Sequence, residues 1–539
     1  MGRKRGSIGE AFDYIGPRAD EAKYYLAWPP DVFAVASYLL RLSGAYVDLK
    51  TQPSRYVQLA THATRDGARW RTAIDRALQT GSRVGASTLR LPRSLVATWD
   101  RLLKSADRDL NSIRERAADV RDLLYLAATA DVASVGFGLG SEDPSAAMAQ
   151  YRLSVAHSLC VFTDPGRLRV FPKQHTPKTG LNLRSLSHHL SLHAGCDVLP
   201  KWQSGSWGPL KAKSEDDAHT AFNILLAPWP LEISQSQFVP AVVDEPLPEG
   251  FGFFEYKHRA RKGVGVSTWL KRALAEVSDL GQKVDLVVFP ESALTEKEFK
   301  QVETLAIEKG FSLIAGVTEA PEAPRRHGKN KISCRFYDRD GTLVEFDQYK
   351  HHRWKLTGGE VRRYGLSGTL SPLKDWWESM RIERRELNFC AVREDIVVCP
   401  LICEDLARQE PVAELVRAVG PNLVIALLMD GPQLPKRWPA RYASVLADDP
   451  GSSVLTLTSL GMAQRSAPPN GGSRSRAIAL WKDSPDEDAV AIELDPDHRA
   501  ALLNIHVRFD REWTADSRHD NGLSARPFMA NYHSIGAKA

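Results

Sequence analysis

Three side chains with complementary chemistry stand at the ends of strand-like segments. Glu291 follows VDLVVFP (284–290), Lys350 ends TLVEFDQYK (342–350), and Cys403 ends IVVCPLIC (396–403). A thiol that gives its proton to a carboxylate can attack an amide or nitrile carbon. A nearby lysine lowers the pKa of the thiol and stabilises the negative oxygen that develops on the substrate. The three residues therefore predict covalent catalysis by a cysteine.

Each residue also has an ordinary structural explanation. Cysteine is among the residue types most often buried, so Cys403 by itself is well explained as a core thiol. An acid such as Glu291 at the end of a buried strand is often only the first solvated residue. The occurrence of all three residues, in order and at strand ends, favours a nucleophile at Cys403. Cys399, four residues earlier, is predicted to be a packed core thiol.

Helices and strands alternate around these residues. Further strand candidates cover 222–227, 311–317 and 331–338, and helix candidates cover 265–280 and 295–309. Strands that alternate with helices are typical of a layered α/β fold, in which reactive residues gather at strand ends. The second half of the chain is therefore expected to be an α/β domain.

The overall composition fits a soluble globular protein of two or three domains. The chain has 539 residues, of which 43% are hydrophobic and 25% charged, and its net charge of +5 does not by itself imply nucleic-acid binding. Its first residues lack the apolar segment of a secretory signal, and no apolar run is long enough to cross a membrane. Six cysteines without a CxxC pair suggest neither a disulfide framework nor a zinc module. We expect a cytoplasmic protein without metal or cofactor.

The first 215 residues have a different pattern from the second half of the chain. Apolar residues at three- and four-residue spacing predict helices at 31–45, 68–80, 94–106 and 108–130, within a helical domain at 1–135. A Gly-rich break at 136–145 and a helix at 146–160 follow, and 146–215 is expected to be a connector that docks on the next domain. The many arginines between 65 and 121 are expected to lie on a solvated helical face, so nucleic acid is not an expected partner.

Two local patterns in this region suggest other chemistry. Arg152 and His157 resemble the Arg-x(4–6)-His motif of HEPN ribonucleases, but Arg184 with His189 and Arg55 with His62 fit it too, so chance explains the match. A second pattern places His189 and His193 one helical turn apart, with Cys196 close behind. No second pair of ligands accompanies them, so packing or surface histidines are the expected explanation.

The contexts of the three strand-end residues resemble the nitrilase (carbon–nitrogen hydrolase) superfamily. VFPES contains Glu291, QYKHH contains Lys350 and LICEDL contains Cys403, at spacings of 59 and 53 residues. Later segments are similar to the family's following elements: NLVIALLM (422–429), RYASVLADDPGSSVLTLTSLG (441–461), AIALWKD and DAVAIELD. The resemblance covers roughly residues 218–512.

The resemblance implies a four-layer αββα sandwich that pairs into homo-oligomers, preceded here by the mainly α-helical N-terminal domain. It implies that Cys403 is the nucleophile and Glu291 the general base, and that Lys350 and the backbone N–H of Glu404 stabilise the oxyanion. Glu360 resembles a second family glutamate that positions the lysine and the substrate. The expected partner is a small amide or nitrile, which would be hydrolysed through a thioester. If another amine intercepted the thioester, the acyl group would be transferred to that amine instead.

Some features depart from the common family pattern. Glu404-Asp405 after the cysteine looks more like the glutaminase domains of glutamine-dependent NAD synthetases, yet no synthetase domain with a phosphate-binding loop follows. The loop at 468–476 either borders the substrate entrance or is disordered, and the tail at 513–539 is expected to be an arm or disordered. The long N-terminal extension motivates an alternative. In it, the protein is a nitrilase-like sensor or scaffold of a bacterial defence system, and its helical region interacts with partners.

Overall fold

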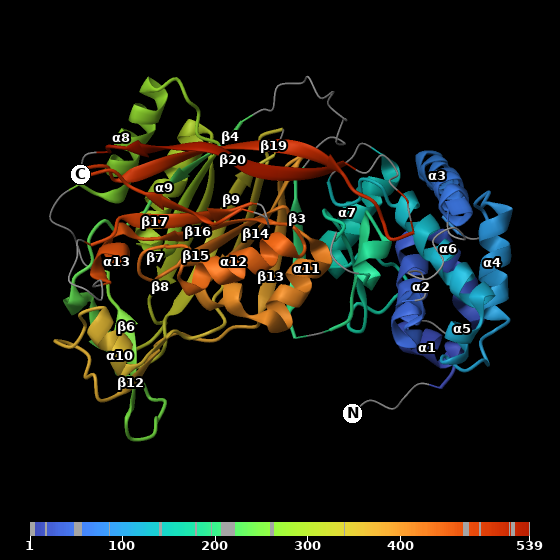
Figure 1. Ribbon diagram of the computed structural model, residues 1–539, viewed down its shortest axis with the longest axis horizontal. Coiled ribbons are helices and arrows are strands. Elements are labelled where there is room, and N and C mark those ends of the chain that lie inside the picture. Colours follow the sequence, from blue (N-terminus) through green and yellow to red (C-terminus); the bar gives the residue numbers. More distant parts are fainter. Residues whose placement is uncertain are drawn as a thin grey trace.

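The protein is described here from a computed structural model. It covers residues 6–16, 19–47, 57–82, 84–85, 87–139, 143–177, 181–195, 197–205, 221–258, 264–338, 340–466, 474–483, 487–516, 518 and 523–537. A helical region formed by the first part of the chain lies beside a larger α/β region (Figure 1). Within the described residues, no helix is both long enough and apolar enough to cross a membrane.

The helical region packs around α2 and α6, which are buried along most of their length. Helix α6 contacts both α2 and α3. Asp31, in the first turn of α2, accepts hydrogen bonds from the N–H groups of residues 161–163. The structure confirms that the predicted segments are helical. The helices of this region are α1 (Ile8–Ile15), the 3-10 helix η1 (Ala19–Ala27), α2 (Pro29–Ser43), α3 (Val57–Gln79), α4 (Arg93–Leu103), α5 (Ser112–Glu115), α6 (Ala117–Ala133) and α7 (Pro144–Ala156).

The α/β region contains two seven-stranded sheets. The first has the order β10-β9-β8-β7-β4-β19-β20, and the second has the order β18-β17-β16-β15-β14-β13-β3. The first is formed by β4 (Phe222–Leu226), β7 (Leu286–Thr295), β8 (Ser312–Glu319), β9 (Lys329–Tyr337), β10 (Leu343–Tyr349), β19 (Ala500–Arg511) and β20 (Leu523–Ile535). The second is formed by β3 (Leu199–Ser204), β13 (Glu386–Arg393), β14 (Ile396–Ile402), β15 (Leu423–Leu428), β16 (Ser453–Thr458), β17 (Ala477–Lys482) and β18 (Val490–Glu493).

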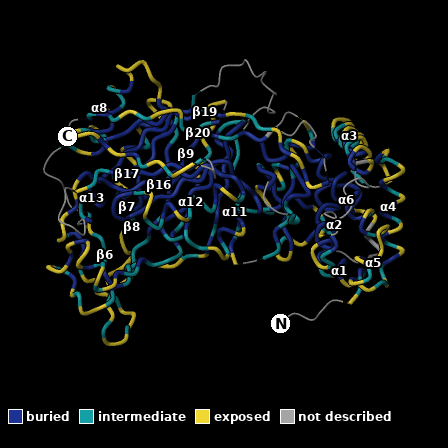
Figure 2. The backbone as a smooth tube through the Cα atoms, in the orientation of Figure 1, coloured by how far each residue is buried: buried dark blue, intermediate teal, exposed yellow. Residues whose placement is uncertain are grey.

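The sheets pack face to face between two layers of helices (Figure 1). Strand β7 contacts β15 and β16 across the core, α8 (Val266–Asp279) and α9 (Glu296–Lys309) cover the first sheet, and α12 (Trp438–Asp448) covers the second. Every residue of β14, β15 and β16 is buried, as expected for apolar parallel strands covered on both faces. Figure 2 shows this continuous buried interior. The predicted four-layer αββα fold behind a helical domain is thus confirmed.

A small lobe stands at one end of the sandwich. It contains a four-stranded sheet with the order β11-β12-β6-β5, the helix α10 (Gly358–Arg363) and a separate hydrophobic cluster around Phe238, Phe254 and Trp354. Its strands are β5 (Phe238–Pro240), β6 (Phe251–Tyr256), β11 (Lys355–Leu356) and β12 (Asp375–Glu378). The lobe matters for function because its side chains cover the ends of the strands that carry Lys350 and Cys403.

Two segments differ from their predictions. The segment 146–215, predicted to be a connector, contains β3, which pairs in parallel with β13 and so completes the second sheet. The tail 513–539, predicted to be an arm or disordered, contains β20, which pairs with β19 over its whole length. Both strands lie at sheet edges and carry many polar residues, so the continuous apolar runs that mark central strands are missing from them.

Buried ion pairs join the helical region to the α/β region. Arg518, which lies between β19 and β20, is fully buried and contacts Asp131 of α6 at 3.2 Å and Asp516 at 2.9 Å. Burial alone would raise the pKa of Asp131, but the charge of Arg518 holds it at about 2. Asp131 also accepts hydrogen bonds from the N–H groups of residues 188–190. The buried Arg518–Asp131 pair therefore joins the two regions.

Candidate active site

Glu291 lies at an irregularity in β7. The pairing of β7 with β8 shifts between Phe289 and Leu294, and Ser292 has a φ of 50°. The strand therefore does not end at Glu291, as predicted, but resumes beyond it. Gly316 of β8 lies against this irregularity, where a Cβ atom would come within 2.6 Å of the Glu291 Cα. Bulges of this kind re-aim a side chain and are common beside active sites.

Glu291 and Lys350 form a buried ion pair. The Lys350 Nζ donates to Glu291 Oε1 at 2.6 Å, and both side chains are only 1% exposed. Burial raises the pKa of Glu291, against the opposing charge of Lys350. Burial alone would lower the pKa of Lys350, but the charges of Glu291 and Glu378 raise it well above its usual range. These pKa shifts favour the charged form of Lys350 and make Glu291 a stronger base than an exposed carboxylate.

Two residues that the sequence analysis did not identify complete this network. Glu378, at the end of β12, also accepts a hydrogen bond from Lys350 Nζ. Asn330 bridges the two acids, because its side-chain Nδ2 donates to Glu291 Oε1 at 2.9 Å and to Glu378 Oε1 at 3.0 Å. Lys350 is thus held between two carboxylates, whose positions are fixed by one amide.

Cys403 begins the 3-10 helix η6 (Cys403–Ala407), directly after β14. Its φ is 47°, a conformation that non-glycine residues adopt rarely and that is frequent at functional sites. Its side chain borders an open cavity of about 370 Å³ between the sandwich and the small lobe. A sharp turn thus presents the thiol to the cavity, and the N-terminal N–H groups of η6 lie next to it in sequence.

Burial raises the pKa of the Cys403 thiol well above its ordinary value, with a further rise from the charge of Glu291. Lys350 lowers it, as the sequence predicted, but burial outweighs this effect. The charge of Glu291 acts on the thiol, so the two groups lie within electrostatic reach of each other, and a carboxylate there can serve as a general base.

Backbone N–H groups connect the buried network to the cavity. Met429 N–H donates to Glu291 Oε2 at 2.9 Å, and Trp354 N–H donates to Glu378 Oε2 at 3.1 Å. Both Met429 and Trp354 line the cavity that contains Cys403. Glu291 and Glu378 are thus each hydrogen-bonded to the backbone of a residue that forms the cavity wall.

Glu360 does not contact Lys350, and the structure has Glu378 in the place that was predicted for it. The Glu360 Oε2 instead accepts from the backbone N–H and the hydroxyl of Thr357, both at 2.8 Å, and so caps α10. Its side chain does line the Cys403 cavity. The carboxylate of Glu404 contacts Arg408, which leaves its backbone N–H as the group of interest for an oxyanion.

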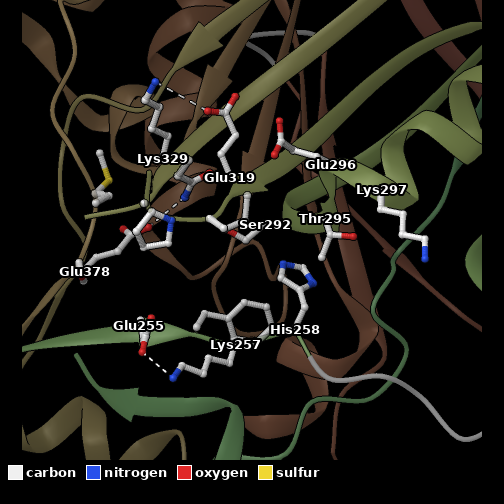
Figure 3. A pocket seen from close by; sticks show the side chains of 18 residues that line it. Glu255, Lys257, His258, Ser292, Thr295, Glu296, Lys297, Glu319, Lys329 and Glu378 are labelled. Carbon is white, nitrogen blue, oxygen red and sulfur yellow. Dashed lines mark hydrogen bonds and ion pairs between the residues drawn. The ribbon is translucent and has the colours of Figure 1, made fainter. Parts of the chain in front are cut away.

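A second cavity of about 420 Å³ borders the network (Figure 3). Glu378 and Asn330 are part of its wall, whereas Cys403 is not. Figure 3 shows two ion pairs in the wall of this cavity, Glu255 with Lys257 and Glu319 with Lys329. Glu378 and Asn330 thus connect the network to a cavity distinct from the one that Cys403 borders.

The other candidates from the sequence do not form sites. Arg152 donates to the carbonyl of Cys160, and His157 ends α7 in a left-handed conformation, so each has a structural role. His189 and His193 lie at a turn and in the strand β2 (Leu190–His193) rather than on a helix. No group of three metal-ligating side chains occurs among the residues that the structure covers. Cys399 is fully buried, in keeping with a core thiol.

Some predictions fall outside the described residues. They concern Cys196, Arg55 and most of the loop at 468–476.

The chain is similar in fold, over about half of its length, to nitrilase-superfamily structures. An amidase from Nesterenkonia sp. is 11% identical, over 52% of this chain and 89% of that chain, with a TM-score of 0.31. Nit3 of Saccharomyces cerevisiae, a member of branch 10 of the nitrilase superfamily, is 15% identical over 51% and 90%, with a TM-score of 0.28. The glutamine-dependent NAD+ synthetase of Acinetobacter baumannii is 14% identical over 57% and 47%, with a TM-score of 0.31.

No protein-family model and no curated protein matches the sequence. At this level of similarity, function has to be inferred from the chemistry of the site itself.

Proposed function

We propose that this protein hydrolyses a non-peptide carbon–nitrogen bond, with Cys403 as the nucleophile. The observation that supports this most is the buried Glu291–Lys350 pair, in which Glu291 is hydrogen-bonded to the wall of the cavity that Cys403 borders. Burying two charges is expensive and adds little stability, so such a pair is better explained by chemistry than by folding. A thiol, a base and a fixed cation are the groups that acyl transfer from an amide requires.

In the first half of the reaction, Glu291 takes the proton of the Cys403 thiol while the sulfur attacks the amide carbon. The electrons of the C=O bond move to the oxygen, whose charge is stabilised by the Lys350 ammonium group and the Glu404 N–H. When the C=O bond re-forms, the C–N bond breaks. Glu291 returns the proton to the leaving nitrogen, so ammonia or an amine departs and a thioester remains on Cys403.

In the second half, Glu291 removes a proton from water, and the hydroxide oxygen attacks the thioester carbon. The same two donors stabilise the second oxyanion. Its collapse breaks the C–S bond, and the sulfur recovers its proton from Glu291, so the carboxylic acid leaves a regenerated site. Glu378 and Asn330 are positioning residues in this proposal, because they hold Lys350 and Glu291 without reaching the substrate.

The test compares two cysteines of neighbouring position. Cys403→Ala should abolish ammonia release from a panel of amides, nitriles and glutamine, and the thioester adduct seen by intact mass spectrometry after rapid acid quenching should disappear. Cys399→Ala, on the same strand but in the core, should retain activity, since it removes only a packed sulfur. Activity in folded Cys403→Ala protein would refute the assignment of the nucleophile.

The narrower expectations stay predictions. They concern the choice between amide and nitrile, the homo-oligomer, the cytoplasmic location and the alternative role as a defence sensor.

A further inference from the structure

The cavity in front of Cys403 is lined by four aromatic side chains in two pairs. Trp354 and Tyr364 make an edge-to-face contact with ring centroids 5.7 Å apart, and Trp438 and Tyr442 make a second one at 6.2 Å. The first pair belongs to the small lobe and the second to α12. A substrate bound to Cys403 would therefore lie between aromatic groups from two separate layers.

The charged side chains of this cavity are paired, with one exception. Lys355 contacts Asp375 at 2.8 Å, and Arg408 contacts Glu404. Asp430 contacts Arg437 at 2.7 Å and also accepts hydrogen bonds from Tyr364 and Trp438. Among the residues that the structure describes, Glu360 is the one charged side chain of this cavity that has no oppositely charged partner.

Glu360 is also held in place by its own helix. Thr357 binds its Oε2 through two hydrogen bonds, and both are directed to the same oxygen. The other carboxylate oxygen stays available to a ligand, and the capping box holds the side chain at the start of α10. A fixed, uncompensated carboxylate beside aromatic rings is the arrangement that binds an ammonium or guanidinium group.

We propose that the substrate carries a positive charge, and that Glu360 and the aromatic side chains of this cavity recognise it. The substrate class is then an amide with an ammonium or guanidinium group on its acyl chain. This inference rests on the proposed function, because it assumes that the Cys403 cavity receives the substrate. It gives Glu360 a role in specificity, separate from the positioning of Lys350.

The first test probes the cavity without turnover. Cys403 is modified by methanethiosulfonates that differ only in charge, the ammonium ethyl and sulfonate ethyl reagents, and Cys403→Ala protein gives the background from other cysteines. Each modification rate constant is divided by that of the same reagent with free 2-mercaptoethanol. In the wild-type protein, the ratio of the cationic to the anionic reagent should exceed one, and in Glu360→Gln this ratio should fall about tenfold. The glutamine still caps α10, so the helix is preserved.

A matched control is available in α9, where Glu298 forms the same type of capping box with Thr295 and lines neither of the two cavities. Glu298→Gln should leave the rate ratio unchanged. An unchanged ratio in Glu360→Gln, or a wild-type ratio below one, would overturn the inference whether or not the protein is a hydrolase.

The second test measures kcat/KM for four small primary amides. They are 4-aminobutanamide, its neutral isostere pentanamide, anionic succinamate and zwitterionic glutamine. The cation should exceed pentanamide by about tenfold or more, and Glu360→Gln should remove most of this preference. Preference for pentanamide or succinamate would refute the substrate class while leaving the hydrolase intact. Absence of turnover with every amide would count against the proposed function, and the modification ratio would then decide the charge preference alone.

Discussion

Replacing Glu378 by glutamine should move the acid limb of the pH–rate profile to lower pH. Glu378 and Glu291 both contact the Lys350 Nζ, within 2.6 Å, so their nearest oxygens are at most about 5 Å apart. Two unit charges about 5 Å apart interact by about 3 kcal/mol at an effective dielectric constant of about 20, which corresponds to about two pKa units.

The sign of the shift follows from which charge is removed. The Glu378 carboxylate raises the pKa of Glu291, in addition to the larger effect of burial. Without that charge, Glu291 loses its proton at lower pH and can act as a base there. Because Lys350 screens part of the repulsion, we expect the limb to move down by about one to two units.

The assay is ammonia release from the best amide of the panel, with kcat/KM measured between pH 4 and 9 and folding checked at each pH by circular dichroism. Glu298→Gln serves as the matched control and should keep the wild-type profile. A limb that stays in place, or that moves to higher pH, would refute the assignment of this limb to Glu291 under the influence of Glu378.

Two further predictions concern stability and the backbone of the site. Arg518→Met should lower the free energy of unfolding in urea by about 3–5 kcal/mol, because it leaves Asp131 buried without its cation. The control Arg508→Met removes only a half-exposed pair with Asp510 at 3.8 Å, so it should lower that free energy by less than about 1 kcal/mol. Equal losses would show that the buried pair does not hold the two regions together. Gly316→Ala should lower the free energy of unfolding by about 1–3 kcal/mol and also lower kcat/KM, because the added Cβ would press on the backbone of Glu291. Gly265→Ala, with open space around it, should leave kcat/KM unchanged. A fully active Gly316→Ala enzyme would contradict the close approach.

The central part of this architecture could be predicted from the sequence because burial leaves a strong pattern. Strands such as Ile396–Ile402 are covered on both faces, so they are continuous apolar runs whose ends are easy to find. Cys403 follows such a run directly, whereas Lys350 follows an edge strand, Leu343–Tyr349, in which polar and apolar residues are mixed. The same reasoning explains why β3 and β20 were missed, since strands at sheet edges keep polar residues and lack that pattern.

Glu378 could not be recognised from its neighbours in sequence. It ends a four-residue strand, DWWE, and nothing in that segment separates a functional acid from a solvated one. Its position depends on the parallel pairing of β12 with β6, which belongs to a lobe assembled from segments more than 100 residues apart. Glu360 shows the reverse case. It resembles the second family glutamate, but the Thr-x-x-Glu pattern at 357–360 gives its carboxylate a capping role.

The buried pair between Arg518 and Asp131 also bears on how the chain folds during its synthesis. The two residues are separated by 387 positions, so Asp131 leaves the ribosome long before its partner is made. At about 5–20 residues per second, this delay is about 20–80 s. During that time the Asp131 carboxylate can be bound only by groups made earlier, such as the N–H groups of residues 188–190. The contact between the helical region and the α/β region is therefore completed only after the segment around Arg518 has been made.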